Sequence, residues 1–276
     1  MILHCRDIQL DLTQARIMGI VNVTPDSFSD GGQHSSTAYA VRHALTLIKQ
    51  GAAAVDIGGE STRPGAVDVP VQQELERVIP VIQRLRGCGA VISVDTRKPE
   101  VMRAAIAEGA HMINDINALQ AEGALAVLAQ SDVAVCLMHK QGQPATMQQA
   151  PAYVDVVSEV QDFLAARLAA ANEFGVTRNR IVLDPGFGFG KSLQHNLKLL
   201  HHLDRFTELD VPILAGLSRK SMLGQLTGRA VDERDFAGGA ALVIAVLKGA
   251  RIIRVHNVAA CADALKIIHA VEASDE

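Results

Sequence analysis

Short runs rich in Val, Ile and Leu alternate along the chain with longer segments of helical period, an order typical of repeated βα units. Eight such runs predict strands: RIMGIVNV (16–23), AAVDIGG (53–59), AVISVDT (90–96), HMINDI (111–116), VAVCLMH (133–139), RIVLDPG (180–186), VPILAGLS (211–218) and ARIIRVH (250–256). Eight units in a chain of this length favour a (β/α)8 TIM barrel, formed as one domain over residues 1–276. A doubly wound open sheet is the alternative, because the same alternation would serve it.

Two further segments fit this pattern. The clearest predicted helix covers 153–174, where apolar residues recur on one face and Gly175 provides a stop. The stretch ILHCRDIQLDL (2–12) precedes the first barrel strand, and we expect it to form a hairpin that closes the bottom of the barrel.

Nearly every predicted strand ends in a polar side chain, although buried parallel strands are otherwise apolar. These residues are Asn22, Glu60, Asp95, Asn114, His139, Asp184, Ser218, Arg254 and His256. In a barrel such ends converge on one mouth, where active sites lie. A strand end can be polar merely because it is exposed, but the number of acids and amides in this set favours a site.

Composition excludes several classes of protein. Apolar residues make up 49% of the 276 positions, which is enough for a substantial core, and Trp is absent. The net charge of −4, with no basic block, argues against nucleic acid as the main partner. The longest apolar stretch, near 240–247, falls far short of the roughly 20 residues that span a membrane, and the amino terminus does not resemble a signal peptide. Four widely spaced cysteines predict reduced thiols and a cytoplasmic location.

The stretch LDPGFGFGKS (183–192) looks like a phosphate loop, but the glycine that this pattern requires is replaced by Pro185. The dinucleotide pattern also fails, because position 191 is Lys. What remains is an acid, Asp184, followed by a glycine-rich turn that leaves room above the carboxylate. Such a carboxylate can accept two parallel hydrogen bonds from an amidine-like ligand edge.

Asp95 and Asn114 end two other strands and would add an acid and an amide to the same mouth. Together with Asp184 they suit a flat nitrogen heterocycle. A structural explanation also stays open, in which Asp95 caps the helix that begins near Lys98 and Asp184 only starts a turn.

Cations at two other strand ends predict an anion site. In LSRKSMLG (217–224) Ser218 is a candidate helix N-cap, and Arg219 and Lys220 fall in the first turn, where positive charge is unfavourable without an anion. Arg254 and His256 lie two apart on the last strand, so they face the same way and could hold a phosphate. The alternatives are that the cations extend into water and that the histidine belongs to the core.

Asn22, at the end of the first strand, could hold Mg²⁺ bridging the same phosphates, although a single amide is weak evidence for a metal. Two long loops, 23–36 and 61–70, follow neighbouring strands and are rich in Pro, Gly, Ser and Asp. Long loops over a barrel mouth usually serve as lids or substrate clamps, and plain surface turns are the alternative.

Eight motifs together closely resemble those of the dihydropteroate synthase family, in the family's order over residues 18–258. They are MGIVNVTPDSFSDGG, DIGGESTRPGA, SVDT, NDI, MHKQG, LDPGFGFGK, GLSRKS and RVHNV. The resemblance implies a (β/α)8 barrel that joins p-aminobenzoate to 6-hydroxymethyl-7,8-dihydropterin diphosphate, releasing pyrophosphate and giving 7,8-dihydropteroate in folate biosynthesis. It further implies a homodimer, bound Mg²⁺ and inhibition by sulfonamides.

The resemblance also implies a role for individual residues. Those matching the pterin pocket are Asp95, Asn114, Met138, Asp184, Phe189, Gly216 and Lys220. Those matching the diphosphate end are Asn22, which would also hold Mg²⁺, Thr62, Arg254 and His256. Those matching the p-aminobenzoate region are Phe28, Thr62, Arg63, Pro64, Ser218 and Arg219. The catalytic set would be Asp95, Lys220 and Arg254. Positions that depart from the family pattern, beside the matched ones, are Arg97, Asn117, Ala118, Lys140 and Asn257.

The implied chemistry is displacement at the pterin methylene, with Arg254, His256 and Mg²⁺ stabilising the departing pyrophosphate. We expect that bond to break largely before the amine attacks, with Asp95 favouring the conjugated cation. Two rival functions stay open: a pterin-binding methyltransferase acting between methyltetrahydrofolate and a corrinoid, and a catalytically silent folate-binding or scaffold barrel. The methyltransferase has no need of the phosphate pair Arg254 and His256 or of the segment SRK (218–220), and both are present.

Overall fold

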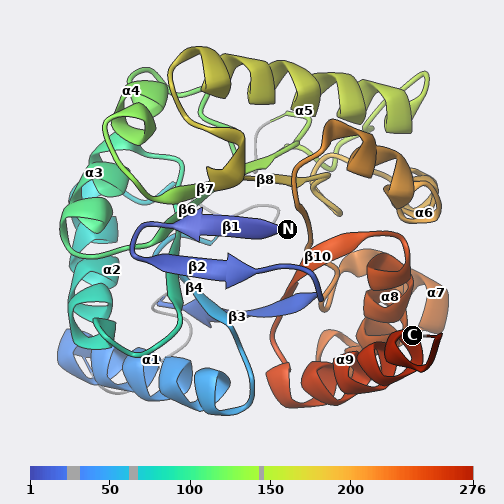
Figure 1. Cartoon of the computed structure of the whole chain (residues 1–276), viewed down its shortest axis with the longest axis horizontal. Coiled ribbons are helices and arrows are strands. Elements are labelled where there is room, and N and C mark those ends of the chain that lie inside the picture. Colours follow the sequence, from blue (N-terminus) through green and yellow to red (C-terminus); the bar gives the residue numbers. More distant parts are fainter. Residues whose placement is uncertain (24–31, 62–67, 143–145, 276) are drawn as a thin grey trace.

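The strands of the computed structural model, which describes residues 1–23, 32–61, 68–142 and 146–275, form a closed parallel barrel (Figure 1). In chain order they are β3 (Arg16–Asn22), β4 (Ala54–Gly58), β5 (Val91–Asp95), β6 (Met112–Asp115), β7 (Ala134–Met138), β8 (Ile181–Asp184), β9 (Ile213–Ala215) and β10 (Ala250–Val255). Each strand pairs with the next, and β10 closes the ring on β3. The predicted TIM barrel is confirmed, and the alternative of an open doubly wound sheet is wrong.

Helices surround this barrel as an outer ring (Figure 1). They are α1 (Gly32–Lys49), α2 (Val71–Leu85), α3 (Pro99–Ala107), α4 (Ala124–Ala129), α5 (Val156–Glu173), α6 (Leu193–His201), α7 (Ser221–Thr227), α8 (Asp235–Leu247) and α9 (Val258–Glu272). The helix predicted over 153–174 is α5. Asp155 caps its start by accepting a hydrogen bond from the Val157 amide, and Gly175 follows its end with a φ of +95°. None of the helices in the described part of the chain is long and apolar enough to cross a membrane.

The amino-terminal hairpin consists of β1 (Ile2–Cys5) and β2 (Ile8–Asp11), and it lies across the middle of the ring in Figure 1. Leu3 and Cys5 from the hairpin are fully buried among barrel side chains such as Met18 and Met112. Burying such side chains stabilises the fold by roughly 1.5–3 kcal/mol each. The prediction of a hairpin at the bottom of the barrel is therefore confirmed.

Strand register sets which side chains share a level inside the barrel. Asp56 on β4 is opposite Ser93 on β5, and two residues further along Gly58 is opposite Asp95. Asp95 is in turn opposite Asn114 on β6. Because inward residues alternate along a strand, these polar groups stand on the interior side above the apolar layer that contacts the hairpin.

Candidate active site

A cavity of about 990 Å³ opens among the carboxyl ends of the barrel strands. Of the polar strand ends, His139 does not line it. Every described residue to which the family resemblance gives a role does: Asn22, Asp95, Asn114, Met138, Asp184, Phe189, Gly216, Ser218, Arg219, Lys220, Arg254 and His256. Phe28, Thr62, Arg63 and Pro64 lie outside the described residues, so their roles stay predictions. Asp184 and Arg254, from strands β8 and β10, therefore face one shared space.

Asp184 stands at the end of β8, where the chain turns sharply through Pro185 and Gly186. Its Oδ1 accepts a hydrogen bond of 2.7 Å from the Gly186 amide. Gly186 has a φ of +69°, and a Cβ there would lie 1.9 Å from the His139 carbonyl oxygen, so only glycine fits. Burial raises the pKa of Asp184, while the Gly186 amide and the Lys220 ammonium oppose that rise.

Lys220 comes to the same region from the loop that precedes α7. Its Nζ lies 4.1 Å from the centroid of the Phe189 ring, a cation–π contact. Burial lowers the pKa of Lys220 to about 8, and the nearby Asp184 carboxylate partly offsets that shift. Lys220 and Phe189 thus form one wall beside the Asp184 carboxylate.

Arg254 is bound by two carboxylates inside the barrel. Its Nε donates to Asp56 Oδ2 over 2.7 Å, and one terminal nitrogen donates to Asp95 Oδ2 over 2.8 Å. Asp56 also accepts from Asn114 Nδ2 at 2.9 Å and from Ser93 Oγ at 2.6 Å. Burial raises the pKa of Asp95 to about 7 against the opposing charge of Arg254, and the two carboxylates hold the pKa of Arg254 above its usual range.

Asp56 is the main residue that the sequence reasoning missed. It is fully buried and does not line the cavity, so it acts on the site by orienting Arg254 and Asn114. A signal was present in the sequence, because Asp56 is the single charge within the apolar run AAVDIGG and lies two residues before a strand-end glycine. Alternation places both on the interior side of the strand.

Two local interpretations from the sequence need correction. Asp95 does not cap α3, whose N-cap is Lys98 without a side-chain hydrogen bond; Asp95 bonds Arg254 instead. Ser218 is not an N-cap either, because α7 begins at Ser221. Its Oγ lies 3.0 Å from His256 Nδ1 and accepts from the His256 amide. The pair joins the last two strand ends at the mouth.

Arg219, predicted in the first turn of that helix, precedes it with a φ of +58°. Its Nε donates to Asp235 Oδ1 over 3.2 Å, and Asn257 Nδ2 donates to the other oxygen of Asp235 over 3.0 Å. Arg219 is thus a partly neutralised cation at the rim, where an incoming carboxylate would have to compete with Asp235.

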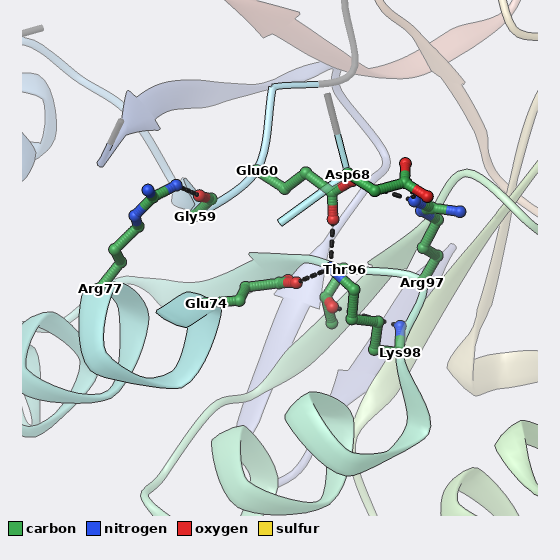
Figure 2. A network of polar contacts seen from close by, with 8 residues as sticks. All are labelled: Gly59, Glu60, Asp68, Glu74, Arg77, Thr96, Arg97 and Lys98. Atoms are coloured by element: carbon green, nitrogen blue, oxygen red, sulfur yellow. Dashed lines mark hydrogen bonds and ion pairs between the residues drawn. The ribbon is translucent and has the colours of Figure 1, made fainter. Parts of the chain in front are cut away.

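A second polar cluster borders the cavity and ties the loop after β4 to the loop after β5 (Figure 2). Arg97 donates to Glu60 at 3.0 Å and to Asp68 at 2.7 Å, and Lys98 pairs with both Glu60 and Glu74. Glu60 lines the cavity, whereas Arg97 does not. Arg97, which departs from the family pattern, therefore lies outside the cavity and holds Glu60 at its edge through an ion pair.

The other departures also lie off the cavity. Lys140 Nζ donates to the Gly142 carbonyl at 3.2 Å, and Asn257 caps α9 by accepting from the Ala260 amide. Neither these two residues nor Asn117 and Ala118 line the cavity.

A possible metal site must be judged from its donors. The part of the chain that the structure describes has no group of three or more His, Cys, Asp or Glu residues able to hold a metal ion. Asn22 offers one side-chain oxygen at the cavity mouth. It is in register with Gly58 on β4, which is in turn in register with Asp95 on β5. This donor set fits a Mg²⁺ ion that is bound mainly by substrate phosphates and water, with one protein ligand.

A cavity at the mouth of a barrel that is lined by the carboxylates of Asp95 and Asp184 and by the Lys220 ammonium is typical of enzymes that bind a flat nitrogen heterocycle. A family model described as pterin binding enzyme matches residues 18–256, which is most of the chain.

Similarity to known proteins identifies the family within this class of enzymes. The dihydropteroate synthase of Escherichia coli (strain K12) is 48% identical over 275 residues, covering 99% of this chain and 98% of that protein. The solved Xanthomonas albilineans dihydropteroate synthase with 4-aminobenzoic acid is 54% identical with a TM-score of 0.93, covering 99% and 98% of the two chains. That of Yersinia pestis with a sulfonamide drug complex is 46% identical with a TM-score of 0.94, covering 99% and 100%. The chain belongs to the dihydropteroate synthase family.

Proposed function

We propose that this protein condenses p-aminobenzoate with 6-hydroxymethyl-7,8-dihydropterin diphosphate, giving 7,8-dihydropteroate and pyrophosphate. The observation that carries the proposal is that Asp184 and Arg254 line one cavity, so a single ligand can reach both. A pterin offers a donor edge that suits a carboxylate, and its diphosphate suits a cation. The family to which the chain belongs supports the same reaction.

The pterin binds in the part of the cavity lined by Asp184, Asn114 and Asp95. One carboxylate oxygen of Asp184 accepts a hydrogen bond from the Gly186 amide, and this bond fixes the plane in which the carboxylate binds the pterin edge. Asn114 is fixed by its bond to Asp56 and presents its amide beside Asp95. Phe189 and Met138 supply the apolar surfaces that a flat ring requires.

The diphosphate binds toward Arg254, His256 and Asn22. Two nitrogens of Arg254 are engaged by Asp56 and Asp95, which orients the guanidinium toward the cavity that it lines. A Mg²⁺ ion bound here with the diphosphate would supply positive charge to the leaving group. Asn22 provides the oxygen that would hold this ion at the mouth.

The reaction is a displacement at the pterin methylene. The C–O bond to the diphosphate breaks, its electron pair leaves with pyrophosphate, and the amine nitrogen then forms the C–N bond and loses one proton. Arg254 and His256 stabilise charge on the leaving oxygens. Asp95 carries the negative charge that favours the conjugated cation. The amine is already a neutral nucleophile, so its site mainly positions it.

The p-aminobenzoate binds at the outer part of the cavity, near Ser218 and Arg219. The Xanthomonas albilineans relative was solved with 4-aminobenzoic acid and the Yersinia pestis relative with a sulfonamide drug, which supports the same ligands for this chain. Sulfonamides would compete with p-aminobenzoate, because both present an aniline nitrogen. The predicted contributions of Phe28, Thr62, Arg63 and Pro64 belong to this end.

The protein acts as a homodimer through α8 and α9. Helices α8 and α9 contact each other. The large apolar side chains exposed on them are Phe236, Ile244, Leu247, Ile267 and Val271. Exposed apolar side chains on adjacent helices are typical of protein interfaces. Sedimentation equilibrium of the wild type and of Leu247→Arg tests this: a monomeric wild type would contradict the homodimer.

Pyrophosphate release is the direct test of the reaction. The protein is mixed with both substrates and Mg²⁺, and pyrophosphate is followed with and without a sulfonamide. We expect release that requires p-aminobenzoate and that the sulfonamide suppresses. Pyrophosphate absent from the complete mixture would refute the proposed function, whereas release without p-aminobenzoate would indicate a diphosphate hydrolase.

A further inference from the structure

Lys191 ends the glycine-rich motif, and its side chain returns to the turn that the motif forms. The Lys191 ammonium donates to the Gly186 carbonyl at 2.9 Å and to the Phe189 carbonyl at 3.1 Å, and it lies 2.9 Å from His139 Nδ1. Only 3% of Lys191 is exposed. A phosphate loop surrounds an anion with backbone N–H groups, whereas this turn surrounds a cation with backbone carbonyls.

The charge of Lys191 acts on Asp184. Burial lowers the pKa of Lys191 to about 7, the Asp184 carboxylate opposes this shift, and the Lys220 ammonium adds to it. In return the ammonium of Lys191 lowers the pKa of Asp184, which burial raises. Burial also lowers the pKa of His139 to about 3, so His139 is neutral and its Nδ1 can accept from Lys191.

Uncharged groups hold the same turn from other sides. The Tyr153 hydroxyl donates to the Gly190 carbonyl over 2.9 Å, and Asn196 Oδ1 accepts from the Gly188 amide over 2.7 Å. The backbone of the turn is therefore anchored without the ammonium. What Lys191 adds to the turn is a positive charge bonded to two of its carbonyls, in addition to the Lys220 ammonium that also acts on Asp184.

We propose that Lys191 is the internal counter-ion of the pterin pocket, a positioning residue that keeps Asp184 ionised and shapes the Gly186–Phe189 turn to receive the ring. The inference rests on the proposed function, because it needs the pterin to bind at Asp184. Lys191 itself lines the cavity, but its ammonium is bonded to the turn and to His139, so it acts on the ligand through Asp184 and Phe189. Loss of the Lys191 charge should therefore weaken pterin binding more than it slows the reaction of the bound substrates.

The test compares Lys191→Met and Lys191→Gln with the wild type. Calorimetry with 6-hydroxymethyl-7,8-dihydropterin diphosphate and Mg²⁺ gives Kd between pH 5 and pH 8, corrected for the folded fraction. We expect Kd to rise roughly ten- to hundred-fold in both variants, with kcat changing less. Acidification should weaken binding at a higher pH than in the wild type, because Asp184 loses a neighbouring cation. Lys191→Gln can still donate to a carbonyl, so it separates charge from hydrogen bonding.

Tyr153→Phe is the matched control, since it removes an uncharged tether of the same turn. We expect its Kd to stay within about twofold of the wild type, with no shift along the pH axis. An unchanged Kd in either Lys191 variant, or an equal rise in Tyr153→Phe, would overturn the inference while leaving the proposed function standing. A wild type that binds no pterin diphosphate overturns both.

Discussion

Replacement of Asp56 by Asn tests whether a residue outside the cavity governs the site within it. Asp56 is fully buried and accepts three hydrogen bonds, from Ser93, Asn114 and Arg254. The Asp56→Asn side chain has nearly the same shape, but it loses the charge that opposes Arg254. It can still offer its oxygen to Arg254 and Asn114 if its amide turns toward the Ser93 hydroxyl.

The magnitude follows from these contacts. Hydrogen bonds to charged groups contribute about 1.5–3 kcal/mol each, and breaking a buried ion pair costs about 3–5 kcal/mol. Asp95 still pairs with Arg254, so we expect the lower end, about 3 kcal/mol in the free energy of unfolding. If a similar amount is lost in the transition state, kcat/KM falls about 100-fold.

Asp115→Asn provides the control. Asp115 is as buried as Asp56 and accepts from the amides of Asn117 and Leu119, both at 2.7 Å, but it does not line the cavity and does not contact Arg254. Urea unfolding gives the stability of both variants, and pyrophosphate release gives kcat/KM per folded molecule. Asp115→Asn should lose stability alone. Our reasoning is refuted if Asp56→Asn keeps wild-type kcat/KM, or if both variants lose it equally.

Three other predictions follow from the same geometry. Asp184→Asn should weaken pterin diphosphate binding by about 2–3 kcal/mol in calorimetry, and an unchanged affinity would remove Asp184 from the pocket. Arg254→Ala should weaken binding of the pterin diphosphate more than binding of free pterin, and equal losses would place Arg254 away from the diphosphate. Because burial lowers the pKa of Lys220 from 10.5 to about 8, the unfolded chain holds more protons in that range, and the free energy of unfolding should rise with pH there. That slope should be smaller in Lys220→Met, as measured by urea unfolding at several pH values.

The barrel was predictable because its signals are local and repeated. Each strand is a short apolar run of the right length, and the ends of these runs carry the polar groups that meet at the mouth. Asp95, Asn114 and Arg254 could thus be assigned to one site without coordinates. The pairing of Arg254 with Asp95 could not, because 158 other residues separate them and only barrel closure brings them together.

Side-chain direction in loops was the part that sequence could not supply. Ser218 followed by two cations matches a helix start, yet the helix begins three residues later and Ser218 pairs with His256. Lys191 matches the lysine of a phosphate loop, yet its ammonium binds the carbonyls of its own turn. The first outcome depends on the positive φ of Arg219 and on the distant His256, and the second on the positive φ of Gly186, Gly188 and Gly190 and on the distant His139.

The hairpin of β1 and β2 affects how ligands enter and leave the cavity. It fills the amino end of the barrel with Leu3 and Cys5, so the cavity is a blind well with its rim at the strand ends. If the pterin binds near Asp184 and p-aminobenzoate nearer the strand ends, we expect the pterin to bind first and its part of the product to leave last. A molecule that stays bound at the strand ends would then block both entry to and exit from the space near Asp184.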